Sequence, residues 1–208
     1  MKKFTAPFVF LIAFLILTFC VKNVPYVTFL DKTLELHIQS ALSFIPLKYP
    51  VFADKTGYLI MIFSGLIAMS IYFIKNKNFI NLGYFLSVPV VTYFINHFLK
   101  LIIQRPRPDL YLQISWIHPH SLSYTSRHTL ITFCLFSIII WFIYKKMSNK
   151  NLKYLGITFC IFWIFMTGLS RIWIGVHYPT DVIGACILGM VITTLYIEIF
   201  KKNNEKTL

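Results

Sequence analysis

The chain has 208 residues, of which 57% are hydrophobic and only 13% are charged. A soluble domain typically carries about 25% charged residues, so this composition excludes an ordinary soluble enzyme or binding module. The formal net charge of +13 does not indicate nucleic-acid binding, because the basic residues gather at the ends of apolar runs, as they do in membrane proteins.

Six apolar runs are each close to the ~20 residues that a helix needs to cross ~30 Å of hydrocarbon. They cover residues 6–21, 57–74, 79–97, 129–144, 155–169 and 182–200. Spans of this length, in which every backbone group must be paired internally, favour helices. We therefore predict an all-α membrane protein with a six-transmembrane-helix bundle, forming a single domain over residues 1–208 with a motif-bearing core at 79–200.

The first run follows Lys2 and Lys3, a pattern that a signal peptide shares. Because no small-x-small cleavage site follows Leu17, we expect a retained first helix. With the N-terminus in the cytoplasm, more than half of the 20 basic residues lie in cytoplasmic segments, as the positive-inside rule requires. The prediction is a multi-pass protein of a bacterial cytoplasmic (inner) membrane, with both termini cytoplasmic and the polar segments extracytoplasmic.

The longest connection, residues 22–55, follows the first run. Apolar residues recur in it at near-helical spacing among Asp31, Lys32 and Glu35. This pattern predicts an amphipathic helix that lies at the membrane interface and is ended by Pro46 and Pro50. A loop folded over the bundle is the alternative.

The third run extends into polar sequence, with Lys100 and Arg107 seven residues apart. Pro106 disfavours a helix that continues through Arg105, because a residue before proline is biased away from helical angles. The two cations can still converge at the mouth of the helix. An interfacial basic belt that contacts anionic head groups is the alternative.

The fourth run opens with Ser126-Arg127-His128. Ser126 is a good N-cap by residue type, and a helix N-terminus behind it offers backbone N–H groups to an anion. Taken alone, His128 is equally compatible with an interfacial histidine that has no special role.

The fifth and sixth runs are joined by a segment that contains Ser170, Arg171, His177 and Asp181. Ionisable groups at a bilayer boundary are costly and usually functional. Each also has a structural explanation, because Arg171 can simply extend toward the interface and Asp181 can interact favourably with the dipole of the following helix. Together, the basic side chains of the three polar segments suit a tetrahedral dianion. Two histidines and one carboxylate remain, enough for a nucleophile, its orienting partner and a proton donor.

These segments resemble the three motifs of the type 2 phosphatidic acid phosphatase (PAP2) superfamily, K-x6-R-P, P-S-G-H and S-R-x5-H-x3-D, in the same order. The matching residues are Lys100, Arg107, Pro108, Ser126, His128, Ser170, Arg171, His177 and Asp181. The second motif matches only in part, because Thr125 replaces its proline and Arg127 replaces its glycine. The resemblance covers residues 79–200, and the six-span plan extends it to the whole chain.

The resemblance implies a two-step displacement at phosphorus. His177 attacks while Asp181 holds its other ring nitrogen, and His128 protonates the leaving oxygen before water releases phosphate from His177. The residues implied to bind the phosphate are Lys100, Arg107, Ser126 and Arg171, and we predict that Arg127 and Ser170 join them. No metal and no cofactor are expected, since side-chain cations offset the charge of the transition state.

Arg127 is the departure with a functional consequence. Glycine at this position of the family motif lets a backbone N–H approach phosphate, and an arginine can require a different backbone angle. As an additional cation, Arg127 would instead favour a more highly charged substrate, such as a diphosphate.

The sequence thus predicts a metal-independent lipid phosphate or diphosphate phosphatase that acts at the extracytoplasmic face through a phosphohistidine. Undecaprenyl diphosphate, phosphatidic acid, phosphatidylglycerol phosphate and lipid A phosphates are all open as substrates. A lipid phosphotransferase of the same fold is the first alternative, and a catalytically silent phospholipid-binding membrane protein is the second. No nucleic-acid partner is expected.

Several other residues are assigned to packing or to no site. The four cysteines are scattered singly through apolar runs and predict neither disulfides nor a zinc site. His97 is expected to serve helix packing or the interface, and Ala185 with Gly189 to serve helix packing. His118 and His120 resemble a metal pair only superficially.

Overall fold

The computed structural model describes residues 5–46, 48–108 and 122–206. Its elements, in chain order, are α1 (Thr5–Asn23), α2 (Pro25–Ala41), α3 (Lys48–Phe52), the π-helical turn η2 (Ala53–Gly57), α4 (Tyr58–Lys75), α5 (Phe79–Ile103), α6 (Arg127–Lys146), α7 (Lys150–Trp173) and α8 (Pro179–Lys206). His118 and His120 lie outside the described residues.

Six helical stretches are long and apolar enough to cross a membrane: Thr5–Asn23, Lys48–Lys75, Phe79–Ile103, Arg127–Lys146, Lys150–Trp173 and Pro179–Asn203. They correspond to the six predicted runs, and the described residues contain no strand. The predicted all-α, six-span membrane bundle is therefore confirmed.

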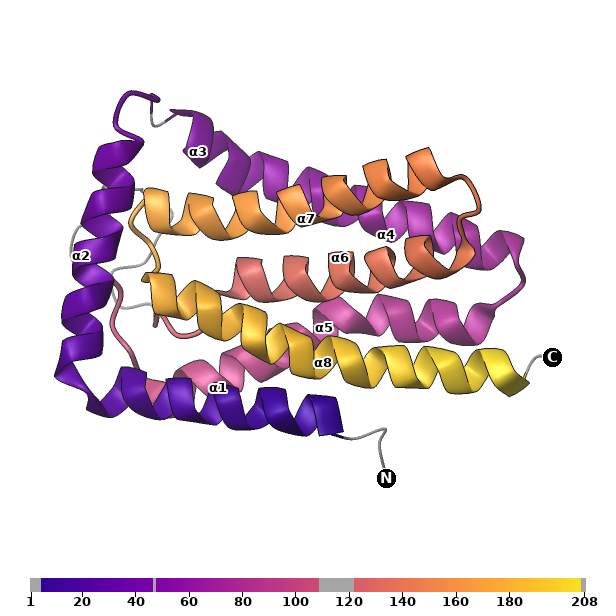
Figure 1. Cartoon of the computed structure of the whole chain (residues 1–208), viewed down its shortest axis with the longest axis horizontal. Coiled ribbons are helices and arrows are strands. Elements are labelled where there is room, and N and C mark those ends of the chain that lie inside the picture. Colours follow the sequence, from indigo (N-terminus) through magenta and orange to yellow (C-terminus); the bar gives the residue numbers. More distant parts are fainter. Residues whose placement is uncertain (1–4, 47, 109–121, 207–208) are drawn as a thin grey trace.

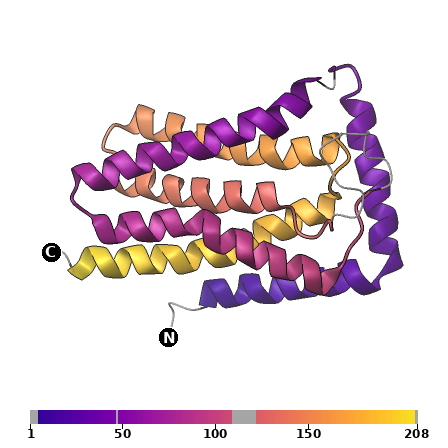
Figure 2. The ribbon, with the colours of Figure 1, turned by 180° about the vertical axis from the view of Figure 1, so that it is seen from behind.

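Figures 1 and 2 show α1 and α4–α8 running along one axis, while α2 lies across one end of the bundle. The 104–108 and 122–126 segments and the α7–α8 connection meet under α2 at this end, and both chain termini lie at the other. Because successive spans alternate in direction, the connections after the first, third and fifth spans, which are the polar segments singled out in the sequence, gather on one side of the bundle.

Helix α6 is the central element of the core. It packs against α4, α5, α7 and α8, and Leu130, Cys134 and Ile138 on it are fully buried. At Gly189 of α8 a Cβ atom would lie 2.5 Å from the Phe133 ring, so this glycine allows α6 and α8 to approach closely, as the small-residue pattern of α8 predicts.

Local capping explains where the site-bearing helices begin and end. The Ser126 hydroxyl accepts from the Thr129 backbone N–H at 3.5 Å and starts α6. Helix α5 ends at Ile103, and Gln104 follows with a left-handed backbone (φ 54°). The chain thus leaves the helix before Arg105-Pro106, as expected from the proline.

Helix α2 is the predicted amphipathic segment, but two of its details differ. It ends at Ala41, well before Pro46, and Pro50 lies inside α3. Its buried residues are Asp31 and Glu35, whereas apolar side chains such as Phe29 are exposed. The acidic face turns inward because the end of the bundle offers cations and backbone N–H groups, and the apolar face is left for the lipid surroundings.

Candidate active site

His177 and Asp181 lie one helical turn apart at the start of α8. Asp181 Oδ2 is 3.2 Å from His177 Nδ1 and also accepts the Tyr178 backbone N–H at 3.0 Å. Both side chains are almost fully buried. Because an ionised carboxylate can only accept, this contact assigns the proton to Nδ1 and leaves a lone pair on Nε2.

The Nε2 atom of His177 faces Arg107. The Arg107 guanidinium nitrogen lies 3.3 Å from Nε2 and donates to the Val176 carbonyl at 2.6 Å. Arg107 and His177 come from different polar segments, 70 residues apart in the chain. The first and third motifs therefore meet at the ring nitrogen that carries the lone pair.

Four cations surround this point. Lys100, Arg107, Arg127 and Arg171 lie close enough for their charges to act on one another. Lys100 Nζ donates to the Leu122 carbonyl at 2.5 Å. Such a cluster attracts a multiply charged anion, and its arginines can donate in forked pairs.

The buried Nε atoms of Arg127 and Arg171 have no hydrogen-bond partner among the described residues. A buried donor without an acceptor is costly, and phosphate oxygens are strong acceptors. The two orphaned N–H groups therefore fit an anion-binding site.

Burial and the surrounding cations shift two pKa values outside the spans. The pKa of His177 is well below 6.5, because burial disfavours the imidazolium and Arg107, Lys100 and Arg171 add repulsion. Burial, followed by repulsion from Arg171, lowers the pKa of Arg107 to about 10. At neutral pH His177 is thus a neutral base and Arg107 remains a cation.

His128 stands in the first turn of α6, with its ring 4.2 Å from the ring of Tyr58 between centroids. It lies close enough to His177 and Arg171 for their charges to act on it. A second imidazole thus stands near the nucleophile candidate and can exchange a proton with a group bound there.

The two serines of the motifs are buried and have local hydrogen-bond partners. Ser126 caps α6, and its hydroxyl accepts from the Thr129 hydroxyl at 2.9 Å. The Ser170 hydroxyl donates to the Thr167 carbonyl at 2.9 Å. Because the Ser126 hydroxyl only accepts in these contacts, its own O–H and the backbone N–H groups at the start of α6 can both donate to an anion.

The two departures from the second motif have specific partners. Thr125 accepts from Asn96 of α5 through both its carbonyl (2.9 Å) and its hydroxyl (2.8 Å). Arg127 lies over the ring of Tyr93, with its guanidinium carbon 4.6 Å from the centroid. Arg127 is therefore partly held by a cation–π contact, and it still contributes its charge to the cluster.

Comparison with known proteins identifies the family of this chain. The family model of the PAP2 superfamily matches residues 81–205, which is more than half of the chain. The chain belongs to the PAP2 superfamily.

Two curated relatives of this PAP2 chain come from Bacillus subtilis (strain 168). Phosphatidylglycerophosphatase B is 32% identical over 100 residues, covering 47% of this chain and 47% of the relative. Undecaprenyl-diphosphatase BcrC is 32% identical over 106 residues, covering 50% of each chain. The matched stretch thus spans about half the length of these relatives.

A solved structure shares the whole architecture. The transmembrane PAP2 type phosphatidylglycerolphosphate phosphatase from Bacillus subtilis superposes with a TM-score of 0.72 at 23% identity, covering 95% of this chain and 96% of that one. At this identity the likeness establishes the fold.

Sequence reasoning missed several buried residues at this end of the PAP2 bundle. Arg105 pairs with Asp181 and Asp31, each at 2.6 Å. Arg171 pairs with Asp54 of η2, and the Ser123 hydroxyl donates to Asp181. The signals were present but unspecific: Arg105 sits in an Arg-Pro-Arg-Pro repeat, and Asp31 and Glu35 are four residues apart on an amphipathic helix.

His97 is exposed and its ring stacks on Tyr93, with the planes 2° apart. Its contact is with Tyr93 of the same helix, as expected of a packing or interfacial histidine. The described residues contain no group of three or more His, Cys, Asp or Glu side chains that could hold a metal ion.

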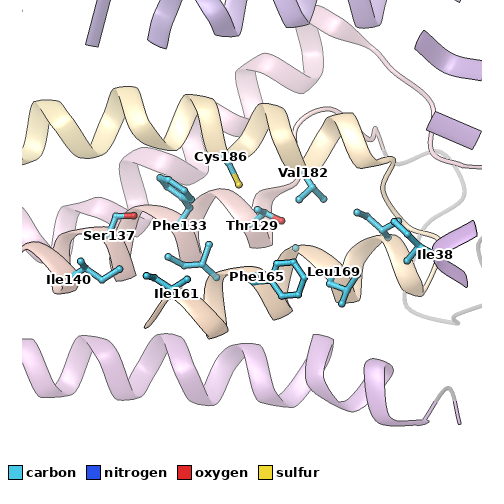
Figure 3. Close-up of a pocket in the computed structure, with 13 residues that line it drawn as sticks. Ile38, Thr129, Phe133, Ser137, Ile140, Ile161, Phe165, Leu169, Val182 and Cys186 are labelled. Carbon is cyan, nitrogen blue, oxygen red and sulfur yellow. The ribbon is translucent and has the colours of Figure 1, made fainter. Parts of the chain in front are cut away.

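An apolar groove of about 600 Å³ runs beside the site, between α6, α7 and α8 (Figure 3). Phe133 and Ser137 of α6 form part of its lining, with Phe165 of α7 and Cys186 of α8. Ile38 of α2 lies at the end where α7 and α8 join. Three lining residues, Thr129, Ile172 and Val182, directly follow His128, Arg171 and Asp181 in the sequence.

Proposed function

We propose that this chain is a lipid phosphatase that removes phosphate from a lipid phosphate or diphosphate without a metal ion, through a phosphohistidine on His177. The observation that carries the proposal is the placement of His177, with Nδ1 on Asp181 and Nε2 facing the cation cluster. Family membership and the names of the two curated relatives support the reaction class.

In the first step Nε2 of His177 attacks phosphorus, and the bond from phosphorus to the leaving oxygen breaks. Asp181 stabilises the positive charge that the ring gains, as the carboxylate does in hydrolase triads. Lys100, Arg107, Arg127 and Arg171 offset the charge on the phosphoryl oxygens. The low pKa of His177 keeps its lone pair available at neutral pH.

His128 in its protonated form gives its proton to the leaving oxygen. In the second step it takes a proton from water, which attacks phosphorus and breaks the N–P bond. The products are phosphate and the dephosphorylated lipid, and both histidines return to their starting protonation states.

The apolar groove supports a lipid rather than a soluble ester as substrate. Its volume lies in the ~300–1,000 Å³ range of ligand sites, and it lies among the helices that carry His128, Arg171 and Asp181. A hydrocarbon chain bound in this groove would lie at membrane depth while its phosphate occupied the polar end of the bundle.

The positive-inside rule supports an extracytoplasmic site in a bacterial cytoplasmic membrane, with the lysine-rich turns and both termini on the opposite side. Undecaprenyl diphosphate and phosphatidylglycerol phosphate are the leading substrates, since the curated relatives are named for them.

The test is phosphate release by the detergent-purified protein from a panel of lipid phosphates and diphosphates, with EDTA present. His177→Ala serves as the control. We expect metal-independent release that disappears in the variant. Binding of these lipids without release would overturn the proposal in favour of a silent binder, and transfer of phosphate to an acceptor lipid would identify a phosphotransferase.

A further inference from the structure

Arg105 is a buried arginine that belongs to none of the three motifs. Its guanidinium donates to Asp181 Oδ1 at 2.6 Å through one nitrogen and to Asp31 Oδ2 at 2.6 Å through another. It also donates to the Thr180 hydroxyl at 2.8 Å and lies 4.2 Å from the centroid of the Tyr178 ring. This planar fork is fixed on every side, which a lysine could not reproduce.

Asp31 connects this arginine to α2. Its carboxylate accepts from the Thr180 backbone N–H at 3.0 Å and from the Thr180 hydroxyl at 2.5 Å. These contacts dock α2 on the first turn of α8, where Thr180 immediately precedes Asp181. Asp31 is 1% exposed, so its bonds to Arg105 and Thr180 are shielded from water and strong.

The contacts of Asp181 divide between its two oxygens. Oδ1 receives Arg105, while Oδ2 receives His177 Nδ1, the Tyr178 backbone N–H and the Ser123 hydroxyl. A carboxylate held at Oδ1 cannot rotate freely, so Oδ2 stays directed at the imidazole. Arg105 thus acts on His177 through Asp181 and does not touch the ring.

The charges of Arg105 and Asp31 also affect how strongly Asp181 stabilises an imidazolium. Arg105 alone would neutralise Asp181 and weaken its attraction for an imidazolium. Asp31 restores one net negative charge to the group of three, which preserves the stabilisation that the attacking histidine needs. Burial lowers the pKa of Arg105, but the attraction of Asp181 and Asp31 outweighs it, so the pKa lies above its ordinary value.

We propose that Arg105 and Asp31 form a positioning pair that holds Asp181 in register with His177, so that α2 is a working part of the catalytic apparatus. This inference rests on the proposed role of His177 as nucleophile. It assigns a function to an interfacial helix that lies outside the region matched by the family model.

The experiment measures kcat, KM and the pH dependence of kcat/KM for Arg105→Gln, Arg105→Lys, Asp31→Asn and the double variant Arg105→Gln with Asp31→Asn. We expect Arg105→Gln and Asp31→Asn to lower kcat by about 10- to 100-fold, the usual cost of losing an outer partner of a working group. KM should change little, because Lys100, Arg107 and Arg171 remain. Arg105→Lys should recover part of the loss.

The pH profile separates positioning from loss of fold. Arg105 is one of the cations that lower the pKa of His177. Arg105→Gln should therefore raise this pKa and move the acid limb of the kcat/KM profile, where activity falls as His177 is protonated, to higher pH. Asp31→Asn should move it to lower pH, and the double variant should return it toward the parent. The other charged or titratable groups that face His177, namely Asp181, Arg107, Lys100, Arg171 and His128, are unchanged in every variant.

Glu35→Gln is the matched control, since it removes a buried carboxylate from the same face of α2. Glu35 is hydrogen-bonded to Gln39 at 3.3 Å. An equal fall in kcat in this control, or acid limbs that move in the same direction in Arg105→Gln and Asp31→Asn, would overturn the inference. If the parent shows no phosphate release that depends on His177, the proposed function fails; if it does and kcat is unchanged in the pair variants, only the positioning role fails.

Discussion

Arg105 and Arg171 are two buried arginines that pair with aspartates from the N-terminal part of the chain, but they differ in the hydrogen-bond donors that each can still offer to a ligand. Arg105 is bonded to Asp31, Thr180 and Asp181. Arg171 pairs with Asp54, and its buried Nε has no partner among the described residues. The first arginine is committed to holding a neighbour, whereas the second still has a donor to offer an anion.

The comparison extends to two regions of the chain. The motif residues lie within 81–205, the stretch that matches the PAP2 family model, and they supply the groups that can contact phosphate. The aspartates at 31 and 54 come from the preceding region and set the charge and orientation of those groups. The groups that can contact phosphate and the aspartates that orient them thus come from different parts of the sequence.

The largest expected effect belongs to the proposed nucleophile. His177→Ala should lower phosphate release by at least about 10⁴-fold, because groups that act as one catalytic unit fail together. Single-turnover assays on the purified variant would measure this, with thermal unfolding as the check on fold. Activity within tenfold of the parent would remove His177 from the role of nucleophile.

His128→Ala should be damaging in a way that depends on the leaving group. For a lipid alkoxide we expect a loss of about 10²–10⁴-fold, the range of general acid catalysis. For p-nitrophenyl phosphate, whose leaving oxygen needs no proton, the loss should be much smaller. Equal losses on both substrates would contradict a proton-donor role and leave His128 with a positioning or binding role.

Asp54→Asn sharpens the contrast between the two arginines. Removing one partner of a buried ion pair costs about 3–5 kcal/mol, so the melting temperature should fall. At the same time Arg171 gains freedom to bind an anion, and the inhibition constant of orthovanadate should fall by about tenfold, the scale of one charge-assisted hydrogen bond. Asp31→Asn is the matched control, and it should not tighten vanadate binding because Arg105 faces Asp181.

The parent enzyme should keep its activity on the acid side of neutrality. His177 must be neutral to attack, and burial with neighbouring cations holds its pKa well below 6.5. Corrected for ionisation of the substrate and of the proton donor His128, kcat/KM should therefore remain flat from about pH 7 to below the ordinary histidine pKa of ~6.5. An acid limb centred near that ordinary value would show that a bound anion or another group restores the imidazolium.

The smallest effect is expected in the groove of Figure 3. Cys186→Phe places a ring in the space between α6, α7 and α8. It should raise KM for long-chain lipid phosphates by on the order of tenfold, the scale of a steric change in an apolar pocket. KM for a short-chain soluble phosphate should be unchanged, and a parallel rise for both would mean that the groove does not hold the tail.

Much of this arrangement follows from the sequence. The six spans could be predicted because each is a long apolar run, and the ends of α5 and α6 because Pro106 and Ser126 have strong local preferences. The residues of the three motifs were identified through their spacing.

The contacts of Arg105 could not be predicted in the same way. Its partners Asp31 and Asp181 lie 74 and 76 residues away, and no local pattern specifies which buried acid meets which arginine. For the same reason the inward turn of the acidic face of α2 escaped prediction, since periodicity defines a face without saying what it packs against.

The first and last spans are neighbours in this bundle, because α1 packs along α8. Tyr124 lies two residues before Ser126, the N-cap of α6, and is held between α1 and α8. Its hydroxyl is hydrogen-bonded to the hydroxyl of Thr18 of α1 at 2.9 Å, and its ring fills the space that Gly184 of α8 leaves open. The order of biosynthesis therefore matters. A chain still emerging from the ribosome has α1 in the membrane but lacks its partner, so the contacts that hold Tyr124 are complete only after the final helix has been inserted.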